Sequence, residues 1–271
     1  MPGSAGTLVL VGCGQMGSAM LRGWLASAAA ARFVAIEPAG APSALAGAAG
    51  VAWHKMAEEL PASLAPDAVV FAVKPQVFDD VLPAYRRWAR PGTVFMSIAA
   101  GKTIAGLARH LGDAAIVRAM PNTPAAVGRA ITVACANPNV TPAQRGLCEG
   151  LLAAIGESTW VEDEALMDAV TAVSGSGPAY VFLLIEALAQ AGEKAGLPAE
   201  LALRLARATV AGSGELARLS AETPARLREN VTSPGGTTRA ALDVLMAADG
   251  MIPLFEHAVA AATSRSRELA S

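Results

Sequence analysis

The stretch Thr7-Leu-Val-Leu-Val-Gly12-Cys-Gly14-Gln-Met-Gly17 decides the fold, because an apolar β-type run leads through three spaced glycines into a run of helical character. In a dinucleotide-binding turn, the first glycine permits a tight bend, the second lets the backbone approach a pyrophosphate, and the third lets the helix pack closely on the strand. A helix that continues to about Ala30 would point its free N–H groups at the phosphates. The alternative interpretation is a glycine turn with no ligand. The residues predicted to bind the cofactor here are Gly12, Gly14, Gln15, Met16 and Gly17.

The composition excludes several classes of protein. A chain of 271 residues can hold one large domain or two smaller ones. A formal net charge of −2 offers no basic face for nucleic acid. Hydrophobic residues make up 53% of the chain and aromatic residues only 4%, so the core must consist mainly of Ala, Val and Leu. The three cysteines are odd in number and lack metal-ligand spacing, which favours a reducing compartment and predicts no metal site.

The N-terminus does not resemble a signal peptide, since it lacks a positively charged segment and glycines interrupt its apolar stretch. No later segment offers about eighteen consecutive apolar residues free of charge, Gly and Pro. We therefore expect a soluble cytoplasmic protein with no membrane partner.

Strand and helix patterns alternate along the first part of the chain, as a doubly wound sheet requires. Near residue 162 the pattern changes to helices only. The predicted fold class is α/β, with a Rossmann-type doubly wound sheet in residues 1–161 and an all-α helical dimerisation domain in residues 162–271. The predicted strands span residues 7–12, 32–37, 51–53, 68–73, 93–98, 115–119 and 130–134, with an optional edge strand at 158–161. The predicted helices of the second domain span residues 164–173, 178–195, 198–219, 224–231, 238–248 and 251–269.

The predicted helix Pro178–Ala195 is apolar nearly all round. A helix of that composition is buried on every side, and a helical domain of this size cannot easily enclose it alone. A subunit interface is therefore the preferred interpretation. The alternative is a central helix in a monomeric bundle.

Three short segments follow predicted strands at the edge where ligands bind in open α/β sheets. Ala72-Val73-Lys74-Pro75 places Lys74 where it can hydrogen-bond cofactor or substrate. Ser97-Ile-Ala99-Ala-Gly101 has small residues against which a nicotinamide ring can lie flat. Arg118-Ala-Met-Pro-Asn122-Thr-Pro124 has two prolines around Asn122, which would hold its amide stiffly towards the same edge. Ordinary loops and turns remain the alternative for each segment.

A fourth segment, Val231-Thr-Ser233-Pro-Gly235-Gly236-Thr237-Thr238, opens a predicted helix. Consecutive glycines leave backbone N–H groups free to point inward, and the helix N-terminus adds partial positive charge. This pattern predicts an anion cradle that suits a small carboxylate. No Ser-His-Asp, Cys-His or metal cluster accompanies it, so chemistry that needs only a hydride donor and an oriented acceptor fits the inventory.

These segments, together with Ser174-Gly-Ser-Gly-Pro-Ala-Tyr180, resemble the pyrroline-5-carboxylate reductase family in order and spacing from about residue 7 to residue 269. The resemblance implies reduction of the C=N bond of 1-pyrroline-5-carboxylate to L-proline with NADH or NADPH, the last step of proline biosynthesis. It also implies a homodimer through intertwined helical domains, sometimes assembled further into a decamer.

The resemblance further implies which residues bind which ligand. The substrate carboxylate would be held by Ser233, Gly235, Gly236, Thr237 and Thr238. The cofactor would lie along the glycine turn and along Ala72, Val73, Lys74, Pro75, Ala99 and Asn122. The proposed catalytic residues are Thr238, whose hydroxyl can exchange a proton with the new amine, and Lys74. The sequence shows no obvious general acid.

Glu37 bears on the choice of coenzyme. It ends the second predicted strand twenty residues after Gly17, where an acidic side chain can hold the ribose 2′-hydroxyl. The residues that follow, Pro38 to Ser43, contain no Arg or Lys to meet a 2′-phosphate. The sequence therefore predicts a preference for NADH over NADPH.

Two other functions remain open at this point. A β-hydroxyacid dehydrogenase also joins this glycine turn to a helical domain, but its catalytic lysine position corresponds here to Val181. A redox sensor without catalytic activity would need the nucleotide turn but not the segment from Ser233 to Thr238.

Overall fold

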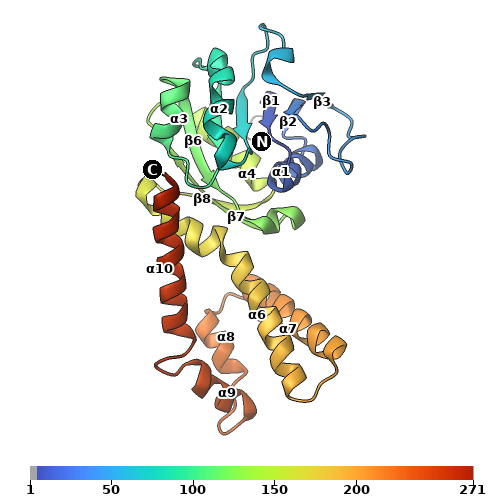
Figure 1. Ribbon diagram of the computed structural model, residues 1–271, viewed down its shortest axis with the longest axis vertical. Coiled ribbons are helices and arrows are strands. Elements are labelled where there is room, and N and C mark those ends of the chain that lie inside the picture. Colours follow the sequence, from blue (N-terminus) through green and yellow to red (C-terminus); the bar gives the residue numbers. More distant parts are fainter. Residues whose placement is uncertain (1–4, 271) are drawn as a thin grey trace. The chain divides into compact units, whose positions relative to one another are not determined.

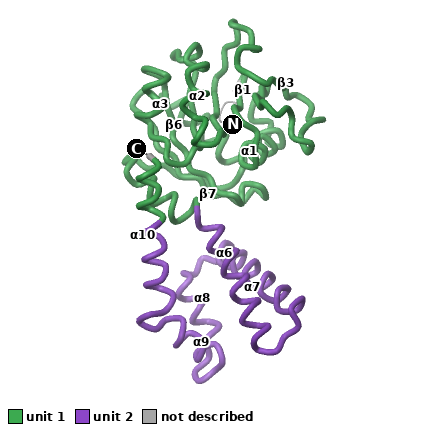
Figure 2. The backbone as a smooth tube through the Cα atoms, viewed as in Figure 1, with its two compact units in different colours: residues 1–175, 262–271 green, residues 176–261 purple. Residues whose placement is uncertain are grey.

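The computed structural model describes residues 5–270, and the chain divides into two compact units (Figure 2). Unit 1 comprises residues 1–175 and 262–271, and unit 2 comprises residues 176–261. The sequence placed a boundary near residue 162, which is where the sheet ends, since the last strand stops at Trp160. The helical segment that follows packs with the sheet up to Gly175, because its buried Met167 joins Val133 and Cys135 in one apolar cluster.

Unit 1 is built on one eight-stranded sheet with the order β3-β2-β1-β4-β5-β6-β7-β8 (Figure 1). All neighbouring strands are parallel except β6 and β7. The strands are β1 Ala5–Val11, β2 Ala30–Ile36, β3 Val51–His54, β4 Ala68–Phe71, β5 Val94–Ser97, β6 Ala115–Met120, β7 Ala130–Ala136 and β8 Gly156–Trp160. Every predicted strand is present, including the optional edge strand, and no strand end differs from its predicted position by more than two residues.

Side-chain caps mark the starts of two α-helices of unit 1. The α-helices of this unit are α1 Gln15–Ala26, α2 Phe78–Val81, α3 Ile104–Leu111, α4 Pro142–Ala153 and α5 Met167–Val170. Thr103 caps α3 through Gly106 N, and Thr141 forms a capping box with Gln144 at α4. Helix α1 ends four residues earlier than predicted, because Ala28 adopts a positive φ of 51° and Ala30 already belongs to β2.

Two apolar layers cover the two faces of the sheet. Successive residues of β1 alternate between them, so that Leu8 and Leu10 pack on one side and Val9 and Val11 on the other. The first layer receives α1 and α4, which are also joined by a hydrogen bond of 2.8 Å from Trp24 Nε1 to Leu151 O. The second layer receives α2, α3 and the 3-10 turn Leu82–Trp88. This is the doubly wound arrangement that the sequence predicted.

Unit 2 is helical throughout the residues described. Its helices are α6 Gly177–Lys194, α7 Ala199–Leu219, α8 Pro224–Asn230, α9 Thr237–Leu245 and α10 Met251–Ala270, the last of which ends in unit 1. The helix predicted at 164–173 is instead a 3-10 turn Glu164–Leu166, the short α5, and a π-helical turn Thr171–Gly175.

Helix α6 is not enclosed by its own chain. Ala189 is its single buried residue, whereas Phe182 and Leu183 are 57% and 63% exposed. The monomeric bundle with α6 at its centre is therefore wrong for this chain. By length and composition, the helical run Glu164–Lys194 would also be long and apolar enough to cross a membrane.

Candidate functional site

A cavity of about 640 Å³ lies at the carboxyl ends of β1, β2 and β4. Strands β2 and β4 flank β1, so the chain turns in opposite directions on the two sides of β1, which is where open α/β sheets bind ligands. Six of the residues predicted to bind the cofactor line it: Gly12, Gly14, Glu37, Ala72, Val73 and Lys74. The remaining predicted ones, Gln15, Met16, Gly17, Pro75, Ala99 and Asn122, do not line this cavity.

The glycine turn has the geometry that a dinucleotide requires. Gly12 has a φ of +87°, and its N–H donates to Ile36 O at 2.8 Å. A Cβ on Gly12 would lie 2.9 Å from Ala72 O, and a Cβ on Gly17 would collide with Gly12 O. No atom stands within 4 Å of a Cβ built on Gly14, so the backbone is open there. The turn therefore fits a bound pyrophosphate at Gly14, with α1 packed closely behind it.

Cys13 contributes its backbone to the turn rather than its sulfur. The Ser18 hydroxyl donates to Cys13 O at 2.8 Å and fixes the bend. Burial raises the pKa of the Cys13 thiol, so the sulfur stays protonated and unreactive at neutral pH.

The Glu37 carboxylate is held in the cavity wall by two backbone N–H groups. Glu37 Oε2 accepts from Cys13 N at 2.7 Å, and Oε1 accepts from Ala39 N at 3.2 Å. Both oxygens of the predicted ribose-binding group are therefore oriented by the protein, and the carboxylate is tied directly to the glycine turn.

Lys55 lines the same cavity as Glu37. The sequence analysis did not predict Lys55 as a residue of the site. The segment after Glu37 has no cation, but β3 pairs with β2 in the register Ile36↔His54, and this brings the residue after β3 beside the end of β2. The strand order, once known, would have revealed it. The cavity therefore carries an acidic and a basic side chain at its edge.

Asn122 is fixed by partners within unit 1. Its side chain is buried, its Nδ2 donates to Ser174 O at 3.1 Å, and its Oδ1 accepts from Ile131 N at 3.1 Å. The amide is as stiffly held as predicted, but both of these hydrogen bonds are made to the protein's own backbone. A role in cofactor binding remains a prediction for Asn122, as it does for Ala99, which is buried behind β5.

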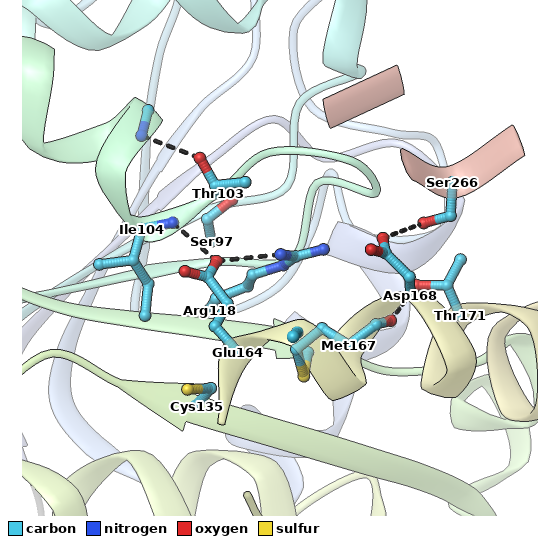
Figure 3. A network of polar contacts seen from close by, with 12 residues as sticks. Ser97, Thr103, Ile104, Arg118, Cys135, Glu164, Met167, Asp168, Thr171 and Ser266 are labelled. Atoms are coloured by element: carbon cyan, nitrogen blue, oxygen red, sulfur yellow. Dashed lines mark hydrogen bonds and ion pairs between the residues drawn. The ribbon is translucent and has the colours of Figure 1, made fainter. Parts of the chain in front are cut away.

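A polar network that the sequence did not suggest joins the segment at Glu164 to Arg118 and to the start of α3 at Ile104 (Figure 3). Glu164 Oε1 accepts from Arg118 Nη1 at 2.9 Å and from Ile104 N at 2.8 Å. The Arg118 side chain is only 6% exposed. From the same segment, Asp168 Oδ1 accepts from the Ser266 hydroxyl of α10 at 2.7 Å.

In unit 2, the predicted anion cradle opens α9. Gly235 has a φ of +68°, Gly236 is the N-cap, and the helix starts at Thr237. Gly236 N donates back to Ser233 O at 3.1 Å, which closes the turn, while the first N–H groups of α9 have no partner within the helix. Thr238 is half-buried in this first turn, and the next residue, Arg239, is paired with Asp243 at 2.8 Å. The cradle therefore offers backbone N–H groups and hydroxyls to an anion.

Two family models match the chain. Residues 164–269 match the pyrroline-5-carboxylate reductase dimerisation model, and residues 7–101 match the NADP oxidoreductase, coenzyme F420-dependent model. The pyrroline-5-carboxylate reductase of Pseudomonas aeruginosa is 40% identical over 264 residues, which cover 97% of this chain and 96% of that protein. The Synechocystis enzyme of the same name is 47% identical and covers 75% of each chain.

Solved structures agree with these matches. A pyrroline-5-carboxylate reductase from Coxiella burnetii superposes with a TM-score of 0.89 at 32% identity, covering 99% of this chain and 100% of the other. The pyrroline carboxylate reductase of Plasmodium falciparum with NADP bound gives a TM-score of 0.83 at 32% identity, covering 98% of each chain.

Proposed function

The chain belongs to the pyrroline-5-carboxylate reductase family, and from that premise we propose how its own residues carry out the reduction of 1-pyrroline-5-carboxylate to L-proline. The chain is an NAD(P)H-dependent oxidoreductase that acts on a C=N bond, in the last step of proline biosynthesis. The observation that carries the mechanism is the pairing of a glycine turn shaped for a pyrophosphate with a glycine-rich helix N-terminus shaped for a carboxylate.

The residues of unit 1 bind and orient the coenzyme. Gly12 and Gly14 bring the backbone to the pyrophosphate, and Gly17 lets α1 point its N-terminus there. Lys74 stands at the cavity wall after β4 with an exposed side chain that can hydrogen-bond the coenzyme. When bound, the reduced nicotinamide supplies the hydride.

The residues of unit 2 bind and orient the substrate. The N–H groups of Thr237 and Thr238, which have no partner within α9, anchor the substrate carboxylate beside Gly236, aided by the positive end of the helix. The protonated cyclic iminium accepts a hydride readily, so orientation is the main task of the protein, and it can contribute up to roughly 7–11 kcal/mol in well-oriented cases. The Thr238 hydroxyl exchanges a proton with the ring nitrogen.

NADH is the preferred coenzyme in this proposal. The Glu37 carboxylate, fixed by Cys13 N and Ala39 N, can accept from a ribose 2′-hydroxyl and repels a 2′-phosphate. Lys55 at the same cavity opposes that repulsion and keeps the discrimination moderate.

The enzyme works as a soluble cytoplasmic homo-oligomer, a dimer or a decamer built from dimers. The matched dimerisation module covers the same residues that expose apolar side chains on α6. An apolar groove of about 770 Å³ between α9 and α10, lined by Leu242, Leu245, Ile252 and Phe255 among others, offers further surface to a second copy. The family match thus favours a subunit interface over a membrane span for the long apolar helix.

The decisive experiment is oxidation of NADH and of NADPH by the purified protein with 1-pyrroline-5-carboxylate, with proline identified as the product. Turnover is expected with both coenzymes and faster with NADH. Thr238→Ala should reduce turnover or substrate affinity and leave coenzyme binding intact. Coenzyme binding without proline formation would refute the proposal and favour a sensor. A β-hydroxyacid dehydrogenase gains no support, because the exposed Val181 brings no acid–base group.

A further inference from the structure

The loop from Ser97 to Thr103 is held from one side by Glu164, sixty residues away from its neighbour Ile104 in the sequence. Thr103 caps α3 by accepting from Gly106 N, which leaves Ile104 N without a partner in the helix. Glu164 Oε1 takes that N–H at 2.8 Å. A carboxylate at the N-terminus of a helix is also favoured by the helix dipole.

The same carboxylate oxygen is locked by a buried cation. Arg118 Nη1 lies 2.9 Å from Glu164 Oε1, and Arg118 sits opposite Ser97 in the register of β6 with β5. A buried ion pair is maintained only when its geometry is good, because each unpaired charge would be strongly penalised. Glu164 Oε1 therefore connects Ile104 at one end of the loop to Arg118, which lies opposite Ser97 at the other end (Figure 3). This fixes the two ends of the loop relative to each other.

The other side of the loop rests on the last turn of α10. Gly101 has a φ of +75°, and a Cβ built on it would lie 3.0 Å from Leu269 Cβ and 3.1 Å from Leu269 O. That turn is held by Asp168, which accepts from Ser266 at 2.7 Å and lies 3.9 Å from Arg267 Nε. Glu164 and Asp168 belong to one short segment, so this segment clamps the loop on both sides.

We propose that Glu164 is a positioning residue, which acts through Arg118 and Ile104 to hold the loop Ser97–Thr103 in place for hydride transfer. The proposal rests on the proposed function and on the sequence-based expectation that a nicotinamide ring lies flat against the small residues of Ser97–Gly101. The adenosine and pyrophosphate parts of the coenzyme have their own cavity, which this loop does not line. Loosening the loop therefore affects the chemical step rather than coenzyme affinity.

The test is Glu164→Ala, compared with Glu162→Ala as a matched control. Glu162 is two residues away and its ion pair with Arg145 spans 3.5 Å, but its side chain is 89% exposed and reaches no part of the loop. Glu164→Ala should lower kcat roughly 10-fold to 100-fold, since small misplacements at a reacting centre have effects of this size. The coenzyme Kd should change less than about 2-fold, and the deuterium isotope effect on kcat with coenzyme labelled at the transferred position should rise.

A second variant guards against misfolding, because Glu164→Ala leaves Arg118 as a buried unpaired charge. The double variant Arg118→Met, Glu164→Leu removes both charges and the acceptor for Ile104 N, and should still show the raised isotope effect. A merely structural role would lower the active fraction and Tm without changing the isotope effect. Unchanged kcat and isotope effect in these variants of an active enzyme would overturn the inference. A wild-type protein that forms no proline would refute the proposed function first, and the inference with it.

Discussion

Gly12 shows how much of the function depends on a single residue. Its φ of +87° belongs to the left-handed region, and a Cβ would meet Ala72 O at 2.9 Å. The residue after the strand must therefore lack a side chain if β1 and β4 are to stay paired at this edge.

Gly12→Ala should destabilise the protein by about 1–3 kcal/mol, from the positive φ and the close approach together. It should also weaken coenzyme binding, because the turn can relax only by moving the backbone that faces the pyrophosphate. Urea unfolding and a coenzyme titration measure the two effects. Gly14→Ala is the matched control for stability, since its Cβ would meet nothing within 4 Å. Equal stability of the two variants would contradict the packing argument.

Glu37 and Lys55 set coenzyme preference at the same scale. Glu37→Ser removes the carboxylate that repels a 2′-phosphate, and Lys55→Met removes the cation that attracts it. The value of kcat/KM for NADPH divided by that for NADH should rise about 10-fold in Glu37→Ser, as expected for the loss of one charge contact. It should fall about 3-fold in Lys55→Met, as expected for a weaker, solvent-screened contact. Steady-state kinetics with both coenzymes gives the ratios, and shifts in the same direction would disprove opposing roles.

At the scale of elements, an ion-pair cluster ties α2 to α3. Asp79 Oδ2 lies 2.7 Å from Lys102 Nζ, and Oδ1 lies 3.1 Å from His110 Nε2. The hydrogen bond from Lys102, aided by that of His110, lowers the pKa of the Asp79 carboxyl, while partial burial opposes the shift.

Because this pKa is lower in the folded state, the cluster stabilises the protein above the unfolded pKa of about 3.9, and the contribution is lost as the pH falls through the folded pKa. Asp79→Asn should therefore lower the free energy of unfolding by about 0.2–1 kcal/mol at pH 7, the range of exposed pairs. The difference from wild type should shrink towards zero at an acidic pH below the folded pKa of Asp79. Urea unfolding at both pH values measures it, and a difference that grows on acidification would disprove the assignment.

The elements themselves were largely predictable from the sequence, whereas their contacts were not. Short apolar runs of β-type residues located every strand, and N-cap residues such as Thr103 and Thr141 mark helix starts, because these signals are local. The proximity of Lys55 to Glu37 depends on strand order, and the bond from Ile104 to Glu164 joins residues sixty positions apart. No local pattern encodes either. The glycine turn before α9 could be predicted because consecutive glycines before a helix are themselves a local signal, and its role in binding the substrate stays a prediction.

At the scale of the whole molecule, the exposed apolar side chains of α6 indicate the surface through which the subunits associate. Phe182 on this helix is 57% exposed within the matched dimerisation module. Phe182→Asp should weaken self-association by about 2 kcal/mol or more, the size of an interface hot spot. Light scattering over a concentration series should show monomer where the wild type is oligomeric. Val127→Asp, an equally drastic change at a 75% exposed residue of unit 1, should leave the oligomer intact. An oligomer that survives Phe182→Asp would rule out this face of α6 as the contact.

The return of α10 to unit 1 has a consequence for how the protein is made. Residues 262–270 belong with the sheet, and Leu269 closes against Gly101, yet they leave the ribosome after the whole of unit 2. The sheet domain therefore emerges first but stays incomplete until residues 262–270 have been synthesised, and until then it lacks the turn that supports the loop at Gly101. Contacts of such long sequence separation form late. Because this loop does not line the coenzyme cavity, the nascent sheet domain should bind the coenzyme before residues 262–270 are synthesised, whereas competence for hydride transfer should wait for them.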